Sequence, residues 1–185
     1  MRIENSYLAI ARTIISYLGI ASNDYLTSQI LRIYIFNGPN LNRLGVRKPE
    51  IYGSKSMAQI LLELQQNWPD VHFVYRQSNH EGNLIDWIQA ANEPSAISNQ
   101  PSDVKGIVLN AGGYSHTSVA LRDAVEESLV PVVEVHISDI TRREPFRQIS
   151  LLTDVCAHSI IGKGTDGYLL ATEWLLNNNT KTIIT

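Results

Sequence analysis

The stretch LRIYIFNGPNLNRLG, residues 31–45, combines the two features that decide the fold of this chain. Its first half is a short apolar run rich in β-branched residues, and its second half is a loop with three asparagines. Polar side chains at this density cannot all be satisfied inside a protein, so they belong in a cleft or at the surface. We therefore predict a buried strand that leads into a polar loop at one edge of a sheet.

Four further apolar runs predict strands at residues 71–75, 104–110, 131–136 and 155–161. Apolar residues at helical spacing between them predict the helices 56–68, 82–92, 117–128 and 165–176. Strands that alternate with helices indicate a parallel sheet covered on both faces. With right-handed crossovers, the prediction is an α/β fold: a flavodoxin-like, doubly wound, five-stranded parallel sheet.

Polar segments follow four of these strands, at residues 37–52, 78–81, 110–116 and 136–147. In doubly wound sheets, ligands bind beyond the carboxyl ends of the strands, near a topological switch point. We therefore expect the four segments to converge on one edge of the sheet and to form a binding site there.

The length of 185 residues suits one domain with a substantial core. We expect an N-terminal extension over residues 1–30, a single domain over 31–177 and a polar tail over 178–185. Apolar residues at helical spacing in the extension predict an amphipathic helix.

The formal net charge of −3 gives no electrostatic case for binding nucleic acid. No run of eighteen apolar residues is present, so we expect no membrane-spanning helix and a cytoplasmic location. The single cysteine, Cys156, excludes an internal disulfide framework, and we expect it to be a buried core thiol. No dinucleotide or phosphate-loop fingerprint occurs, so we predict neither a cofactor nor a metal.

Glu134 and His136 lie two residues apart in a predicted strand, so their side chains point to the same side. A carboxylate beside an imidazole fixes its tautomer and favours its protonated form, which suits a general acid. A structural pair, in which the glutamate satisfies a buried histidine, is the alternative that the two residues leave open.

The segment NAGGYSHT, residues 110–117, follows the third predicted strand. Its paired glycines allow the backbone to approach a ligand closely, and His116 can contact a ligand hydroxyl. Ser115 or Thr117 can cap the following helix. Asp123 lies further along that helix beside Arg122, and by themselves these two read as a solvated charge pair.

Tyr52 lies in the polar loop after the first strand, with Arg47 and Arg43 nearby in sequence. A free tyrosine has a pKa of about 10, and a base that works near neutral pH needs it about three units lower, worth about 4 kcal/mol. Desolvation acts in the wrong direction, so adjacent guanidinium groups must supply the effect. Asn40 could hold a water or an oxygen on which negative charge develops. A plain surface loop is the alternative.

Taken together, these segments resemble type II 3-dehydroquinate dehydratase. The matching stretches, in the order of the family, are FNGPNLNRLGVRKPEIYG, RQSNHEGNLIDWIQAA, GIVLNAGGYSHTSVALRD, PVVEVHIS and REPFRQIS, with GYLLA near the end. They cover nearly the whole chain from residue 33 to residue 176.

The resemblance implies a lyase of the shikimate pathway, on the route to aromatic amino acids. It would reversibly dehydrate 3-dehydroquinate to 3-dehydroshikimate through an enolate, without cofactor or metal. It also implies a homo-oligomer, a dodecamer built from trimers. The competing hypothesis is a non-catalytic module that binds a small molecule, a flavin or a phosphate, on the same scaffold.

By resemblance, the base falls on Tyr52, its activating arginine on Arg47, and the asparagine that holds the enolate-side water on Asn40. The proton donor to the leaving hydroxyl falls on His136, with Glu134 as its partner. Substrate contacts fall on a second set of residues: Asn110, His116, Asp123, Ile137, Ser138 and Arg147. The aspartate at position 123 would reach the site of a neighbouring subunit.

The chain departs from the usual pattern of the family at a few positions around the loops. These are Lys48, Asp139, Thr141, Pro145 and Ile149. None of them removes a group to which the resemblance assigns a catalytic role.

Overall fold

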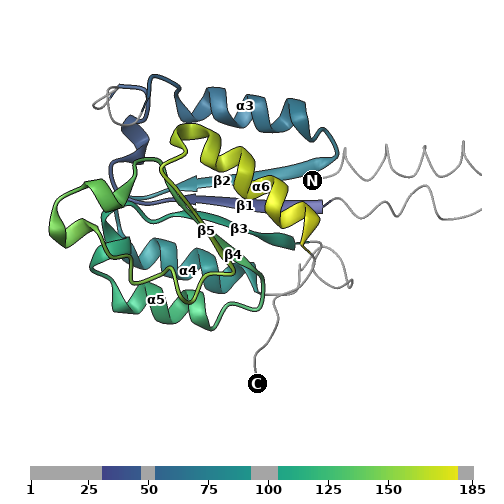
Figure 1. Ribbon diagram of the computed structural model, residues 1–185. Coiled ribbons are helices and arrows are strands. Elements are labelled where there is room, and N and C mark those ends of the chain that lie inside the picture. Colours follow the sequence, from purple (N-terminus) through teal and green to yellow (C-terminus); the bar gives the residue numbers. More distant parts are fainter. Residues whose placement is uncertain (1–30, 47–52, 93–103, 179–185) are drawn as a thin grey trace, which may run out of the picture.

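The computed structural model describes residues 31–46, 53–92 and 104–178 (Figure 1). Residues 1–30, the expected amphipathic helix among them, lie outside the described part of the chain. So do residues 47–52, which include Arg47 and Tyr52, as well as residues 93–103 and 179–185.

The centre of the fold is a sheet of five parallel strands in the order β2-β1-β3-β4-β5. The strands are β1 (Leu31–Asn37), β2 (Val71–Gln77), β3 (Val104–Asn110), β4 (Val132–His136) and β5 (His158–Ile161). The chain reverses its direction of travel across the sheet after β2, which places a topological switch point between β1 and β3. The predicted doubly wound, flavodoxin-like fold is confirmed.

Two helices cover each face of the sheet (Figure 1). Helices α3 (Met57–Asn67) and α6 (Gly167–Asn177) lie on one face, and α4 (Glu81–Ala91) and α5 (Val119–Glu126) lie on the other. Successive strand residues point to opposite faces, so Ile35 packs under the first pair and Phe36 under the second. Burial on both faces explains why the central strands, β3 and β4 above all, read as continuous apolar runs.

Short 3₁₀ turns occupy several of the connections after the strands. They are η1 (Leu41–Arg43), η2 (Gly112–His116), η3 (Ile140–Arg142), η4 (Pro145–Arg147) and η5 (Gly164–Asp166). The η2 turn delays α5, so the helix begins at Val119 and its N-cap is Ser118, which accepts a hydrogen bond from the Leu121 N–H at 2.8 Å. The expected cap at Ser115 or Thr117 is therefore wrong.

The last strand is shorter than the apolar run that predicts it. β5 begins at His158 rather than at Val155, because residues 151–157 form turns. Cys156 lies in those turns and is half-buried at the side of the core, so the expectation of a buried core thiol is wrong. Within the described residues, no helix has the length and apolar character needed to cross a membrane.

Candidate active site

The loops after β1, β3 and β4 surround a pocket of about 150 Å³ at the carboxyl edge of the sheet. It lies beside the switch point between β1 and β3, as the fold predicts. The segment after β2 supports the pocket from behind: the Asn40 N–H donates to Asn79 Oδ1 at 2.9 Å, and the Tyr114 hydroxyl donates to the Asn79 carbonyl at 2.8 Å. The expected convergence is confirmed for the described parts of the four polar segments, whereas residues 47–52 of the first segment lie outside the described residues.

Seven of the residues predicted for the site line this pocket. They are Asn40, Asn110, His116, His136, Ile137, Ser138 and Arg147. Glu134 lies behind His136 in β4, fully buried. Asp123 is exposed on α5 and, in the described part of the chain, lies apart from the pocket.

Glu134 and His136 form the buried pair that the two-residue spacing predicts. Glu134 Oε1 accepts a hydrogen bond from His136 Nε2 at 2.7 Å, and both side chains are at least nine-tenths buried. Burial raises the pKa of Glu134, but the hydrogen bond and charge of His136, with the hydroxyls of Ser150 and Thr153, outweigh it and hold this pKa below its ordinary value. An ionised carboxylate stabilises an imidazolium, and the second ring nitrogen, Nδ1, is left for a ligand in the pocket.

His116 lies against His136, with the ring centres 5.9 Å apart. Its Nδ1 is 2.8 Å from the carbonyl oxygen of Ile149, and because a carbonyl only accepts, Nδ1 is the donor. In the neutral ring Nε2 then carries no proton, so His116 can accept a hydrogen bond from a ligand hydroxyl.

Asn110 is fixed by Tyr168, a residue of α6 that sequence reasoning missed. Asn110 Nδ2 donates to the Tyr168 hydroxyl at 3.1 Å, and that hydroxyl donates to Asn37 Oδ1 at 2.9 Å. Burial raises the pKa of Tyr168, so its hydroxyl keeps its proton. The hydroxyl therefore accepts from Asn110 and donates to Asn37, and these roles do not reverse. Asn110 Oδ1 accepts from the Gly112 N–H at 3.2 Å, which leaves an amide hydrogen for a ligand oxygen.

The charge of the pocket wall is positive. Arg43, Arg143 and Arg147 line it, and among the described residues no acidic side chain does. Arg143 donates to Ser138 Oγ at 3.2 Å. Sequence reasoning missed Arg143, although the spacing of two arginines four residues apart in REPFR could have singled it out. These guanidinium groups suit an anionic ligand.

Asn40 owes its position to an unusual backbone conformation. It has φ 69°, in the left-handed region that asparagine tolerates better than most residues, and its side chain is exposed. Gly38 lies two residues before Asn40, and a Cβ at residue 38 would lie 2.4 Å from the carbonyl oxygen of Ala111. The loops after β1 and β3 therefore meet this closely only because residue 38 has no side chain.

Arg122 does not form the expected pair with Asp123. Its guanidinium donates to both carboxylate oxygens of Asp154 and to the Leu151 carbonyl, so the predicted partner is wrong. Within the described ranges, no group of three His, Cys, Asp or Glu side chains lies close enough together to hold a metal ion.

The model of the family described as dehydroquinase class II matches residues 31–176. A 3-dehydroquinate dehydratase of Exiguobacterium sp. is 45% identical over 149 residues, which cover 80% of this chain and 96% of the relative. Another from Azorhizobium caulinodans is 48% identical over 140 residues, covering 75% and 88%.

Solved structures agree with the sequence comparisons. The type II dehydroquinase from Butyrivibrio crossotus matches with a TM-score of 0.70 and 38% identity, over 79% of this chain and 97% of that one. The type II dehydroquinase from Propionibacterium acnes matches with a TM-score of 0.70 and 34% identity, over 80% and 97%. This chain therefore belongs to the dehydroquinase class II family, the type II 3-dehydroquinate dehydratases.

Proposed function

We propose that this chain dehydrates 3-dehydroquinate to 3-dehydroshikimate in the pocket beyond β1, β3 and β4, and that His136 protonates the departing hydroxyl. The observation that carries this proposal is the buried Glu134–His136 pair, which presents one imidazole nitrogen to a pocket lined by arginines. Family membership supports the same reaction, a lyase step of the shikimate pathway, and does not favour a flavin- or phosphate-binding module.

Substrate binding uses the positive wall and the turn after β4. The carboxylate of the substrate suits the Ser138 hydroxyl and the backbone N–H groups of Ile137 and Ser138, at the start of the η3 turn. His116, Asn110 and Arg147 line the same pocket and can hydrogen-bond the substrate hydroxyls.

The base and its activator lie in the segment 47–52. Tyr52, ionised beside Arg47, removes the proton next to the carbonyl, and the resemblance and the order of the motifs support these two roles. Asn40, at the edge of the same loop, holds the water that stabilises the enolate oxygen. His136 then donates a proton to the leaving hydroxyl, and the Glu134 carboxylate orients the imidazole through its hydrogen bond to Nε2.

The proposed assembly is a dodecamer built from trimers, in which Asp123 completes the site of a neighbouring subunit. Its support is that Asp123 is exposed and apart from its own pocket, and that Phe146 and Ile149 expose 69% and 71% of their surface on the loop after β4. Exposed apolar side chains of this size suit a contact between subunits. Light scattering of Asp123→Ala and of the wild-type chain, with activity measured on both, tests this part separately.

We place the catalytic domain at residues 31–177, which the family model matches to within one residue, with the extension 1–30 and the tail 178–185 outside it. The cytoplasmic location stays a prediction, and cell fractionation tests it.

The direct test is incubation of the purified chain with 3-dehydroquinate while the ultraviolet absorbance of the conjugated enone product is followed. We expect turnover by the wild-type chain, binding without turnover by Tyr52→Phe, and a lower maximal rate with little loss of binding by Arg47→Ala. A wild-type chain that forms no enone, or an equally active Tyr52→Phe variant, contradicts the proposal.

A further inference from the structure

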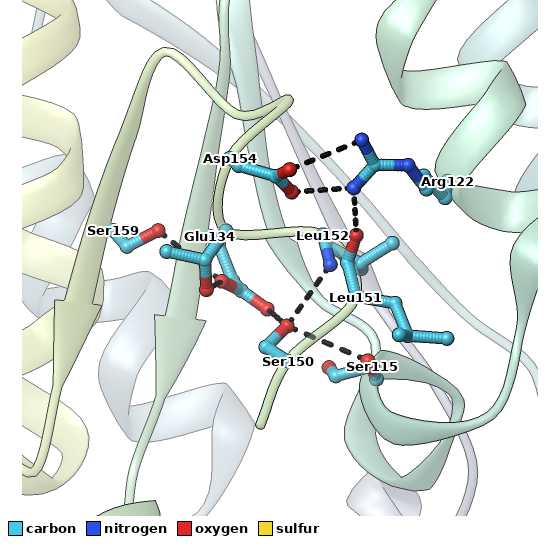
Figure 2. A network of polar contacts seen from close by, with 9 residues as sticks. Ser115, Arg122, Glu134, Ser150, Leu151, Leu152, Asp154 and Ser159 are labelled. Atoms are coloured by element: carbon cyan, nitrogen blue, oxygen red, sulfur yellow. Dashed lines mark hydrogen bonds and ion pairs between the residues drawn. The ribbon is translucent and has the colours of Figure 1, made fainter. Parts of the chain in front are cut away.

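The carboxylate of Glu134 receives more hydrogen bonds than its partnership with His136 requires. Oε1 accepts from the His136 imidazole and from Ser150 Oγ, the latter at 2.5 Å. Oε2 accepts from Thr153 Oγ1 at 2.8 Å and from Ser159 Oγ at 3.2 Å. Figure 2 shows Ser150 and Ser159 beside this carboxylate. Glu134 is 0% exposed, so no solvent contributes to its orientation. Two donors on each oxygen leave this carboxylate one favourable orientation.

Two of the hydroxyls come from a segment that is neither helix nor strand. Residues 150–154 lie between η4 and β5, where the chain forms bends and turns from residue 151 on, and Thr153 is exposed. The backbone of this segment is tied to η2, since the Leu151 N–H donates to the Ser115 carbonyl at 2.7 Å. The hydroxyl of Ser150 also accepts from the Leu152 N–H at 3.2 Å, which fixes the hydroxyl relative to its own turn.

Arg122 of α5 holds the same segment from the other side (Figure 2). Its guanidinium donates to the Leu151 carbonyl at 2.6 Å and makes a two-pronged contact with the carboxylate of Asp154. Leu151 and Asp154 lie immediately beside the two hydroxyl residues in sequence. A planar guanidinium with three acceptors fixes the path of the turn more firmly than a single bond does.

We propose that Ser150, Thr153 and the Arg122–Asp154 pair act as one positioning unit for His136. They hold the Glu134 carboxylate so that Oε1 meets Nε2 of the imidazole and Nδ1 faces the pocket. None of them lines the pocket, so they act through Glu134 and not on the substrate. This inference rests on the proposed role of His136 as the acid.

The decisive comparison is between two substitutions of one residue. Thr153→Val removes the hydroxyl at nearly constant shape, and Thr153→Ser keeps it. We expect Thr153→Val to lower kcat about tenfold, the scale of one hydrogen bond to a charged group, with KM within about twofold. Thr153→Ser should restore most of the rate. Thr172→Val is the matched control, since it removes a buried threonine hydroxyl that bonds only the Tyr168 carbonyl within α6.

The guanidinium contact is tested by a double-mutant cycle. Arg122→Gln should lower kcat about fivefold, with KM nearly unchanged. Thr153→Val should then cost less in the Arg122→Gln background than alone, because the turn is already displaced. Fully additive losses overturn the claim that these residues form one unit. Arg122→Lys and Ser150→Ala serve the same test if Arg122→Gln does not fold.

A readout besides activity separates this inference from the proposed function. Crystal structures of the wild-type chain and of Thr153→Val should show the Glu134 Oε1–His136 Nε2 distance lengthened beyond hydrogen-bonding range in the variant. If the wild-type chain does not turn over 3-dehydroquinate, the proposed function fails and this distance alone decides the inference. An unchanged distance, or a Thr153→Val variant with the kcat of the wild-type chain, overturns the positioning role.

Discussion

The two walls of the pocket are built in opposite ways. The β4 wall is His136, with Glu134 behind it; both are buried in a central strand, and four donors surround the Glu134 carboxylate. The β1 wall, Asn40 and Arg43, is exposed on a loop. The close backbone approach at Gly38 and the hydrogen bond from the Asn40 N–H to Asn79 Oδ1 position it. Pairing of β4 with β3 and β5 fixes the first wall, whereas the second depends on a left-handed turn.

This difference indicates that the proton donor on the β4 wall needs a more strictly fixed geometry, before substrate binds, than the groups on the β1 wall. A proton donor must hold one nitrogen close to a reacting oxygen. A side chain on a buried strand is already fixed in position, so no conformational entropy is lost there when substrate binds. The loop after β1 leads into the segment that carries Tyr52. An exposed loop suits the side of the pocket on which a ligand enters. Substitutions on the β4 wall should therefore cost more rate than substitutions on the β1 wall.

The largest effect is expected for His136→Ala. Loss of a general acid typically lowers the rate by a factor of about 10² to 10⁴, and we expect kcat to fall by about 10³. KM should change little, because the arginines and Asn110 still bind the substrate. Steady-state kinetics by enone absorbance measure both constants, and a loss confined to KM would show that His136 only binds substrate.

Glu134→Gln should give the next largest loss, about 10² in kcat, because a neutral amide no longer stabilises the imidazolium. Removing the charge of one partner of this buried hydrogen-bonded pair also costs stability, about 3 kcal/mol in the free energy of unfolding. Urea unfolding and kinetics on the same preparation measure the two effects. A Glu134→Gln variant that loses stability but keeps its kcat would assign the pair a structural role only.

Two substitutions of Asn40 separate side chain from backbone on the β1 wall. Asn40→Gly keeps the left-handed conformation and loses the amide, so we expect kcat to fall about tenfold with stability nearly unchanged. Asn40→Ala should lose the same rate and, in addition, about 1 kcal/mol of stability from its strained φ. Equal stabilities of the two variants would show that the turn tolerates a Cβ here.

The smallest effect is the pH dependence of stability that Glu134 contributes. Its pKa in the folded chain lies below the ordinary value of 4.5, because hydrogen bonds to the charged form outweigh burial. The ionised carboxylate therefore stabilises the fold above that ordinary value, and the contribution is lost as pH falls through the lower folded-state pKa.

The gap in unfolding free energy between the wild-type chain and Glu134→Gln should thus stay constant near neutral pH and narrow in acid. Urea titrations at a series of pH values measure it. A gap that widens as pH falls would mean that the folded-state pKa is raised.

Sequence patterns predict the fold of this molecule well, because residues that are buried in the sheet are mostly apolar and therefore recur at strand or helix spacing. β-branched runs give all five strands, and two-residue spacing gives the Glu134–His136 pair. The start of β5 is wrong because an apolar run at a sheet edge can form turns as readily as a strand, which also moves Cys156 out of the core.

The supports of the site are harder to predict because they join residues far apart in sequence. The Tyr168 hydroxyl donates to Asn37, which lies 131 residues away in sequence, and no local sequence pattern predicts this contact. The partner of Arg122 is Asp154, on a turn whose path depends on the finished fold, so the sequence neighbour Asp123 is the wrong partner. A buried glutamate implies donors, but the sequence alone does not say which hydroxyls supply them.

Exchange of hydrogen next to the substrate carbonyl tests the assignment of the acid most directly. In deuterated water, His136→Ala should still incorporate deuterium into 3-dehydroquinate, because the proposed base, Tyr52, is unchanged, while enone formation falls by about 10³. Tyr52→Phe should lose both, and a sample without enzyme gives the background. Enone formation by His136→Ala at the wild-type rate, or loss of its exchange together with its dehydration, would contradict the account.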